Sequence, residues 1–278
     1  MSPVEEDNEQ DLTRKQRREQ AREQRKAIEE AEASGAARRK RLIQLGSVIG
    51  AVVVIVVVIL VATSGGGTKK GLEKKPANGG GTPKVVTEVT SLLASIPQNG
   101  NTLGDPKAPV TLQYFGDLEC PICREFTEGA LKPLIEKYVR TGKVKVEYHN
   151  LETATREPET FRTQQAAALA AGKQQKAWDY IELFYHQQGQ EDTGYVTEKY
   201  LQELAKQVPG LNLATWTTDR SDPEFTNTIT SDAQAANNVG FTGTPSFLVG
   251  KSGGTLSKLE YASLSDPSSF ESAINKLL

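Results

Sequence analysis

Residues 110–126 read VTLQYFGDLECPICREF and place a hydrophobic stretch directly before two cysteines. The stretch Val110–Phe115 alternates and is rich in β-branched and aromatic residues, which predicts a β-strand. Apolar residues at helical spacing from Arg124 to Arg140 predict a helix after the cysteines, and Val144–Tyr148 alternates as a second strand. We therefore expect a β-α-β unit, normally built with parallel strands and a right-handed crossover, whose strand-to-helix junction carries the cysteines.

The sequence Cys120-Pro121-Ile122-Cys123 at this junction has the properties of a reactive dithiol. The amino end of a helix offers unpaired N–H groups and the positive end of the dipole, which favour a thiolate. Pro121 suits the first helical turn because it has no N–H to leave unpaired. The i, i+3 spacing places Cys123 on the same side of the helix, one turn further in. We predict that Cys120 attacks a substrate disulfide and that Cys123 resolves the mixed disulfide.

Two other uses of the cysteine pair are a structural bridge and a metal site. A bridge across so short a loop removes little entropy from the unfolded chain. Structural zinc takes four ligands, and the two histidines, His149 and His186, match no zinc spacing with the cysteines. Transient copper(I) binding by the two thiolates remains open. We therefore expect redox chemistry, with no metal and no cofactor.

The first 83 residues differ in composition from the rest of the chain. Residues 1–41 are charged and almost free of apolar side chains, which predicts an arm that is helical or disordered. Residues 42–63 begin with LIQLGSVIGAVVVIVVVILVA, an uncharged run of about 21 residues that would span about 30 Å as a helix. We predict a transmembrane helix there, because in lipid only a helix pairs every backbone group internally. Residues 64–83 are rich in Gly and Lys and predict a flexible linker.

The basic residues around this apolar run predict its orientation. Four consecutive bases, Arg38 to Arg41, precede it, and those beyond it lie in the predicted linker: Lys69, Lys70, Lys74 and Lys75. The positive-inside rule places the amino terminus in the cytoplasm and the carboxy-terminal domain outside it. Ala62-Thr63-Ser64 also fits a cleaved signal peptide, but the charged arm is long for one and so is the apolar run. We expect an uncleaved, single-pass anchor in the cell membrane.

Residues 84–278 predict one α/β domain in the order β-α-β, helices, β-β-α. The helices expected in its second half are Glu159–Gln188, Thr197–Val208, Ser231–Asn238 and Pro267–Leu278. A closing hairpin is expected from Ser246–Val249 and Lys258–Tyr261. The aromatic residues of the helical stretch fit either a core or an apolar groove: Trp178, Tyr180, Phe184 and Tyr185. The formal net charge of −2, with acids and bases mixed, argues against a nucleic-acid partner.

Three segments together resemble a known family. They are LGDPKAPVTLQYFGDLECPICREF from Leu103, AALAAGKQQKAWDYIELFYHQQ in the helical stretch, and VGFTGTPSFLVG from Val239. In these the chain resembles the DsbA-like branch of the thioredoxin superfamily, especially its membrane-anchored bacterial members, over about residues 97–278. The resemblance implies a thioredoxin-like fold with a helical insertion at about 157–230. It also implies that Pro245 is a cis-proline facing the cysteines, and that Thr244-Pro245 offers backbone groups to the substrate chain.

Three residues beside the cysteines bear on the chemistry. Asp117 and Glu119 stand where this family often has acids, and either is a candidate for relaying protons to or from Cys123. The simpler alternative is two solvated carboxylates that close a strand. Ile122 departs from the strongly oxidising members, which have a histidine there. Because isoleucine gives a thiolate neither a hydrogen bond nor a charge, we expect a milder reduction potential.

The leading prediction is a membrane-tethered thiol–disulfide oxidoreductase that acts in oxidative folding on cysteine-containing extracytoplasmic proteins. A reductase or isomerase of the same fold remains open, as do a peptide- or copper-binding module and a scaffold that uses residues 1–41. The resemblance implies a membrane redox partner, either a quinone-linked oxidase or a thiol-reductant conduit. The anchor would add contacts with membrane lipid.

Overall fold

The computed structural model describes residues 83–278. The predicted arm (1–41), the predicted transmembrane helix (42–63) and the predicted linker except for Pro83 lie outside the described residues. Between residues 83 and 278, no helix combines the length and the apolar character needed to cross a membrane. The anchor therefore stays a prediction.

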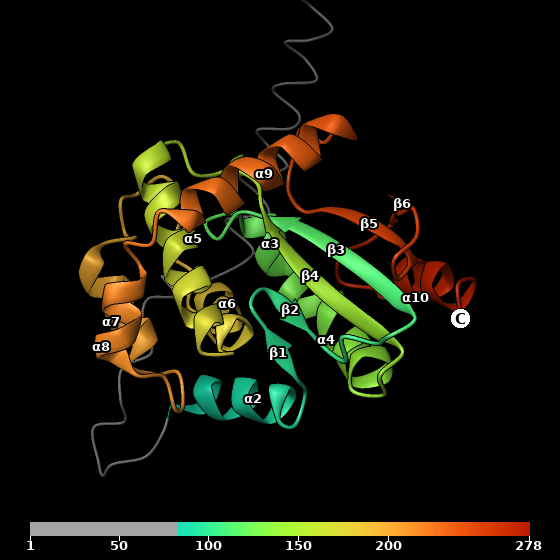
Figure 1. Ribbon diagram of the computed structural model, residues 1–278, viewed down its shortest axis with the longest axis horizontal. Helices are drawn as coiled ribbons and strands as arrows, with labels where there is room; N and C mark the ends of the chain where they lie inside the picture. The colour runs from blue at the N-terminus through green and yellow to red at the C-terminus, as the bar shows by residue number, and fades with distance from the viewer. Residues whose placement is uncertain (1–82) are drawn as a thin grey trace, which may run out of the picture. The chain divides into compact units, whose positions relative to one another are not determined.

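Six strands form one mixed sheet in the order β1-β2-β4-β3-β5-β6 (Figure 1). At its centre, β3 (Val110–Gly116) runs parallel to β4 (Val144–Asn150), and β5 (Ser246–Lys251) pairs antiparallel with β3 on the other side. Six of the seven residues of β3 are buried, as expected for a strand covered on both faces. The predicted β-α-β unit and its parallel strands are confirmed.

The edge strands are short. β1 (Gln98–Asn99) and β2 (Thr102–Leu103) form a small hairpin beside β4, and β6 (Ser257–Lys258) lies beside β5. The prediction of a strand over Lys258–Tyr261 was wrong by several residues. Tyr261 leaves the sheet because its ring packs against Phe247 and Phe270 instead of pairing its backbone with β5.

The helix after the cysteines begins at Pro121, which the sequence predicted for its first turn. It runs continuously through four segments: α3 (Pro121–Phe126), η1 (Thr127–Leu131), α4 (Lys132–Leu134) and η2 (Ile135–Val139). The two η segments are wider π turns on either side of Pro133. A proline inside a helix removes one backbone donor and crowds the preceding turn, and such widening relieves that conflict.

Five helices separate β4 from β5: α5 (Pro158–Lys173), α6 (Ala177–His186), α7 (Glu198–Ala205), α8 (Leu213–Asp219) and α9 (Glu224–Asn238). The predicted helical stretch Glu159–Gln188 is confirmed and contains two helices, because the chain reverses at Gln175, whose φ is 60°. Helix α8 was not predicted, and α9 begins seven residues before the predicted Ser231. Both segments are rich in threonine, which has low helix propensity, and packing of Trp216 and Phe225 overrides it.

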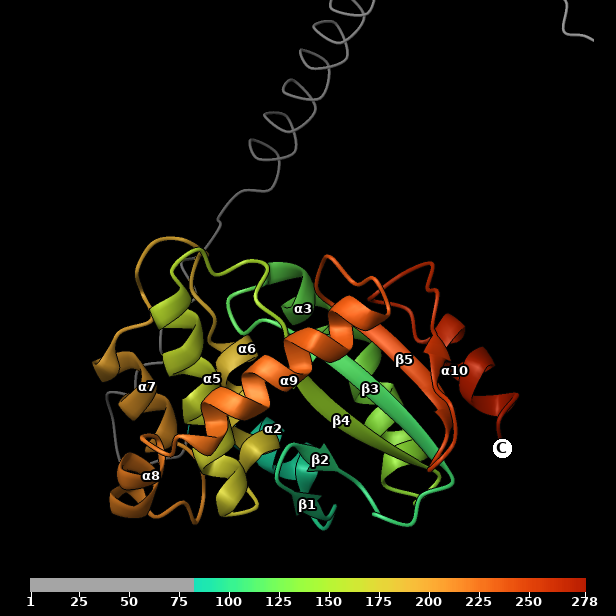
Figure 2. The same ribbon diagram turned by 45° about the horizontal axis from the view of Figure 1, so that its top comes forward.

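Helices cover both faces of the central strands. On one face, Tyr114 packs against Phe126 of α3, and Phe126 packs in turn against Phe247 and against Phe270 of α10 (Ser268–Asn275). On the other face, Phe115 joins a smaller cluster with Leu151, Ala236 and Leu248. Figure 2 shows α9 crossing in front of β4 and β3 on this second face.

The remaining helices lie beside the β1–β2–β4 side of the sheet (Figure 1). Helix α2 (Lys84–Leu93) packs its valines on α6. The aromatic residues for which a core or a groove was expected are fully buried and belong to the main core: Trp178, Tyr180, Phe184 and Tyr185. They are therefore core residues, and α10 confirms the predicted closing helix.

Candidate functional site

The two cysteines lie where the sequence predicted them, at the amino end of α3. Cys120 is the N-cap residue, and its sulfur accepts a hydrogen bond from the backbone N–H of Cys123 at 3.3 Å. Pro121 occupies the first helical position. Both cysteines are free thiols; Cys120 is 4% exposed and Cys123 is 0% exposed. The outer sulfur therefore lies nearest the surface, and the inner one is sealed in the core.

The surroundings of the two sulfurs move their pKa values in opposite directions. Hydrogen bonds, first from the Cys123 side chain and then from Thr244 and the N–H groups of Cys123 and Ile122, lower the pKa of Cys120 from 9.0 to about 7, although burial opposes this. Burial raises the pKa of Cys123 well above its ordinary value. At neutral pH, Cys120 is therefore the more ionised thiol and the better nucleophile or leaving group.

The loop before β5 faces the outer sulfur. The Thr244–Pro245 peptide bond is cis, and the thiol of Cys120 donates to the Thr244 carbonyl at 3.4 Å. Tyr261 supports this loop, because its hydroxyl donates to the Pro245 carbonyl at 3.3 Å. The backbone just before β5 therefore lies directly beside the sulfur of Cys120.

The interpretation of Asp117 and Glu119 as solvated carboxylates is wrong, because they are 0% and 3% exposed. The Asp117 carboxylate accepts hydrogen bonds from three successive backbone N–H groups, those of residues 153–155, at 2.9–3.1 Å. It also accepts from the side chain of Gln164 at 3.2 Å. Asp117 thus ties the loop after β4 to the turn before the cysteines.

Glu119 has a different environment. Burial raises the pKa of its carboxyl group from 4.5 to about 7, and the negative charges of Asp117, Asp192 and Glu191 add to the effect, while a hydrogen bond with Thr155 opposes it. Its protonation state therefore changes near neutral pH, which is what a proton-transferring group requires.

Two apolar side chains beside the dithiol are partly exposed. Ile122 is 47% exposed, which is unusual for a large hydrophobic side chain, and Tyr261 beside the Thr244-Pro245 loop is 36% exposed. Neither position places a charged group beside Cys120.

Sequence reasoning missed the residues that hold the turn before Cys120 from behind. The side chain of Gln188 donates to the carbonyls of Leu118 and Cys120 at 2.7 Å and 3.1 Å. The hydroxyl of Tyr185 donates to the carbonyl of Asp117 at 3.1 Å. Tyr185 lies in the last turn of α6 and Gln188 lies just after that helix, both about 70 positions away from this turn, and no local pattern could connect them with the cysteines.

The histidines considered as metal ligands pair with carboxylates. His149 lies 2.7 Å from Asp232, and His186 lies 3.6 Å from both Glu128 and Glu182. Between residues 83 and 278, no cluster of three or more histidine, cysteine, aspartate or glutamate side chains is arranged to hold a metal ion.

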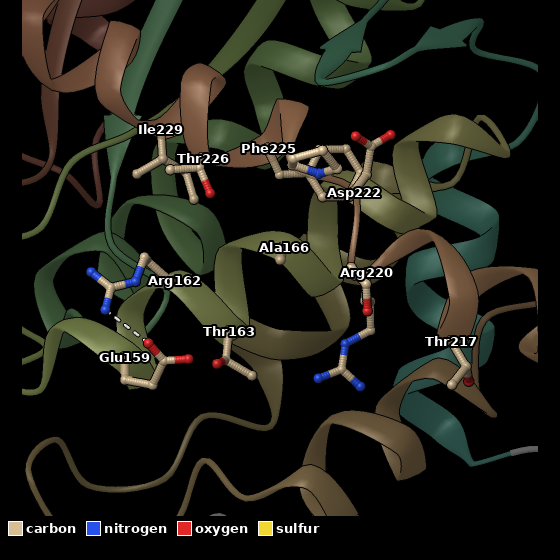
Figure 3. Close-up of a pocket in the computed structure, with 12 residues that line it drawn as sticks. Glu159, Arg162, Thr163, Ala166, Thr217, Arg220, Asp222, Phe225, Thr226 and Ile229 are labelled. Carbon is tan, nitrogen blue, oxygen red and sulfur yellow. Dashed lines mark hydrogen bonds and ion pairs between the residues drawn. The ribbon is translucent and has the colours of Figure 1, made fainter.

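A separate pocket of about 420 Å³ lies between α5, α8 and α9 (Figure 3). Its two guanidinium groups already have partners: Arg162 pairs with Glu159 at 2.8 Å, and Arg220 pairs with Glu198 at 2.6 Å. None of its lining residues belongs to the 117–123 segment or to the Thr244-Pro245 loop. It contributes nothing to the dithiol site.

The chain is similar to known proteins in sequence and in structure. A family model described as thioredoxin matches residues 97–274. The probable disulfide bond formation protein D of Bacillus anthracis is 26% identical over 164 residues, which is 59% of this chain and 74% of that protein. Disulfide bond formation protein D of Bacillus subtilis (strain 168) is 25% identical over 152 residues, 53% of this chain and 66% of that protein.

Solved structures share the fold. Oxidised BdbD from Bacillus subtilis has a TM-score of 0.54 at 21% identity and covers 65% of this chain and 96% of its own. The alpha-DsbA1 protein of Wolbachia pipientis has a TM-score of 0.51 at 20% identity and covers 66% of this chain and 92% of its own. The predicted thioredoxin-like α/β fold is confirmed.

Proposed function

Because this chain belongs to the DsbA-like thioredoxin family, we propose that its Cys120–Cys123 pair exchanges disulfides with extracytoplasmic proteins from a membrane-tethered domain. Family membership carries the general activity, that of a protein-disulfide oxidoreductase. The roles of individual residues, the tether and the direction of electron flow are parts of the proposal. The proposed organisation is an arm (1–41), an anchor (42–63), a linker (64–83) and a catalytic domain (84–278) with a helical insertion at about 157–230.

The proposed reaction is the oxidation of a client dithiol. A client thiolate attacks the Cys120 sulfur of the Cys120–Cys123 disulfide, so that a Cys120–client bond forms and Cys123 leaves with the electron pair of the broken bond. A second client thiolate then attacks the client sulfur of this mixed disulfide and expels Cys120 as a thiolate. The client loses two electrons and gains a disulfide, and the enzyme is left as a dithiol.

The observation that carries this proposal is the contrast between the two thiols. The lowered pKa of Cys120 makes it a good leaving group in the second step, and the Thr244-Pro245 backbone beside its sulfur is the proposed place for an extended client backbone to pair. Cys123 is reachable only by Cys120, because it is 0% exposed. A client thiolate therefore attacks the Cys120 sulfur first, and Cys123 reacts only with Cys120.

Glu119 is the proposed proton carrier. Its pKa of about 7 lets it accept or release a proton at neutral pH, whereas the carboxylate of Asp117 is occupied by the backbone of residues 153–155. We assign Asp117 the role of holding the site together.

The direction of flow depends on the membrane partner. A quinone-linked oxidase that removes the two electrons would make the protein a disulfide donor. A thiol-reductant conduit that supplies electrons would make it a reductase or isomerase, and the neutral, exposed Ile122 favours this second candidate.

The test is the reduction potential of the full-length chain in mild detergent, equilibrated in graded glutathione buffers and scored by alkylation mass shift. A value near about −120 mV supports oxidation of clients, and a value near about −270 mV supports the reductase. A chain that forms no Cys120–Cys123 bond under oxidising conditions contradicts both.

A trapping experiment tests the proposed roles of the two cysteines. Cys123→Ser should accumulate mixed disulfides between Cys120 and client proteins, because the internal thiol that would attack Cys120 and release the client is gone. Cys120→Ser is the matched control and should capture none. Equal capture by both variants would overturn the assignment of Cys120 as the attacking thiol.

A further inference from the structure

Three tyrosine hydroxyl groups meet beneath the inner cysteine, and we call them the tyrosine cluster: Tyr114 of β3, Tyr148 of β4 and Tyr185 of α6. The Tyr185 oxygen lies 3.1 Å from that of Tyr114 and 3.2 Å from that of Tyr148. The three side chains are at most 2% exposed. Burying three hydroxyl groups is unfavourable unless they bond to one another or to neighbours.

The glycine at position 116 makes room for the cluster. A Cβ atom there would lie 3.0 Å from the hydroxyl oxygens of both Tyr148 and Tyr185, and 2.8 Å from a ring carbon of Tyr148. Glycine inside a strand weakens it, and its presence often marks a close approach of other groups. The strand thus carries a residue that leaves space for the hydroxyl groups.

The available protons restrict the hydrogen bonds. The hydroxyl of Tyr185 donates to the Asp117 carbonyl at 3.1 Å, so its oxygen accepts from Tyr114 and Tyr148. Tyr114 has one proton and a second acceptor group within reach, because its oxygen lies 3.5 Å from the Cys123 carbonyl. Rotation of the Tyr114 O–H can therefore direct the proton either to Tyr185 or toward Cys123.

The sulfur of Cys123 is within the influence of this hydroxyl. Burial is the largest effect on the Cys123 pKa and raises it, whereas a hydrogen bond from Tyr114 and one from the Asp117 backbone lower it. A bond from a hydroxyl to a thiolate is stronger than a bond between neutral groups. A negative charge on the inner sulfur would thus draw the Tyr114 proton away from Tyr185.

We infer that Tyr114 is a further catalytic residue, whose hydroxyl donates a hydrogen bond to the Cys123 sulfur while that sulfur carries negative charge, and that Tyr185 holds this hydroxyl ready between turnovers. The inference rests on the proposed function. When a client thiolate attacks Cys120, the Cys120–Cys123 bond breaks and its electron pair stays on Cys123. In the reverse reaction the Cys123 thiolate attacks Cys120 and the client thiolate leaves. The same charge develops in both directions, so the same donor acts in both.

The packing of the ring does not require the hydroxyl group. The Tyr114 ring lies 5.0 Å from Phe126 edge to face and 5.5 Å from Phe247, contacts that phenylalanine would keep. Tyr114→Phe therefore removes the hydrogen bond of the hydroxyl and keeps the packing of the ring. The matched control is Tyr148→Phe, which removes a hydroxyl of the same cluster that contacts Tyr185.

The experiment measures the rates of reduction and of oxidation of the full-length chain by glutathione, by stopped-flow fluorescence. Tyr114→Phe should slow both directions by about tenfold, as expected for one lost hydrogen bond to a charged group, and change the equilibrium constant by less than about twofold. Tyr148→Phe should stay within about twofold of the unmodified chain in both rates. Urea unfolding of each variant reports folding separately.

Two results would overturn the inference: unchanged rates in Tyr114→Phe, or equal slowing in Tyr148→Phe. Should Tyr114→Phe fail to fold, 3-fluorotyrosine incorporated at position 114 decides, because it keeps the ring and changes only the hydrogen-bonding strength of the hydroxyl. Both rates should then change together, and unchanged rates would contradict the inference. If the unmodified chain forms no disulfide at all, the proposed function fails; if it exchanges and Tyr114→Phe exchanges equally well, only this inference fails.

Discussion

At the scale of single residues, the reactivity of Cys120 comes first from the side chain of Cys123 and then from Thr244 and the N–H groups at the amino end of α3. Their hydrogen bonds lower the pKa of Cys120 to about 7. The side chain of Ile122 adds nothing to this stabilisation, since it is apolar and 47% exposed. This position is therefore where the potential can be tuned without disturbing the core.

Replacing Ile122 by histidine should make the dithiol more oxidising. A partly charged ring beside the sulfur should lower the pKa of Cys120 by about one unit and raise the reduction potential by about 30 mV, the equivalent of a tenfold change in equilibrium constant. The measurements are thiolate absorbance against pH and glutathione equilibrium. Ile122→Leu is the control, and identical titrations of the two variants would count against this explanation.

The charge of Glu119 should reduce stability above neutral pH. Its folded pKa of about 7 exceeds the unfolded value near 4.5, so the stability it contributes is fully present below about pH 4.5 and is lost as the pH rises through 7. Glu119→Gln stays neutral, and should be more stable than the unmodified protein by about 1 kcal/mol at about pH 8 and equal to it at about pH 4. Urea unfolding at both pH values tests this. The exposed Glu125→Gln is the control, and a difference independent of pH would contradict the argument.

At the scale of elements, one charged pair joins β4 to α9. Asp232 of α9 accepts from His149 at 2.7 Å and from the backbone N–H of Asn150 at 2.9 Å. Burial lowers the pKa of His149, but the bonds to Asp232 and Glu147 outweigh it and raise the pKa from 6.5 to about 9. These contacts indicate a structural role for His149, because the ring is charged at neutral pH and paired.

Asp232→Asn should destabilise the protein by about 2–4 kcal/mol at about pH 6, because it leaves a buried imidazolium without its main partner. The sign of the pH dependence follows from the raised pKa. The contribution of His149 is fully present below about pH 6.5 and is lost as the pH rises through about 9. The difference between the two proteins should therefore shrink by about pH 10. Urea unfolding across this range is the measurement, with the exposed Glu224→Gln on the same helix as control; a constant difference would exclude the charged pair as its cause.

At the scale of the whole molecule, two distant parts of the chain build one site. The β-α-β unit supplies the cysteines, and the helical insertion supplies Tyr185 and Gln188, which bind the carbonyls of the turn before them. Buried residues of both parts belong to the same core cluster. Substitutions in the insertion should therefore change the properties of the dithiol.

The fragment Lys84–Leu278 should fold alone and stay soluble without detergent. The buried apolar residues identified between residues 83 and 278 form two core clusters that lie between Val85 and Ile274, so truncation at Lys84 removes none of them. Its reduction potential should equal that of the full-length chain in detergent, which serves as the control. An aggregated fragment, or a potential shifted by more than about 30 mV, would show that residues before Lys84 take part in the domain.

Local sequence patterns were sufficient for the central strands, the helix after Cys120, the closing helix and the dithiol. β3 and β4 alternate or are continuously apolar, and the Cys-Pro-Ile-Cys junction has its helix-start signal within four residues. Such signals depend on neighbours along the chain, and these are visible in the sequence. The family resemblance supplied what no local pattern could, the cis-proline at position 245 beside the cysteines.

The tertiary structure decided the environment of each functional group. It buries Asp117 and Glu119, for which the sequence also allowed solvated carboxylates. It also forms α8 from a segment with weak helix propensity. It also brought Tyr185 to Tyr114 across 71 positions. The sequence by itself determined which residues can react, because that depends on chemical type and local backbone. Their pKa values, partners and order of attack depend on burial and on contacts between distant segments, and these exist only once the insertion has packed against the sheet.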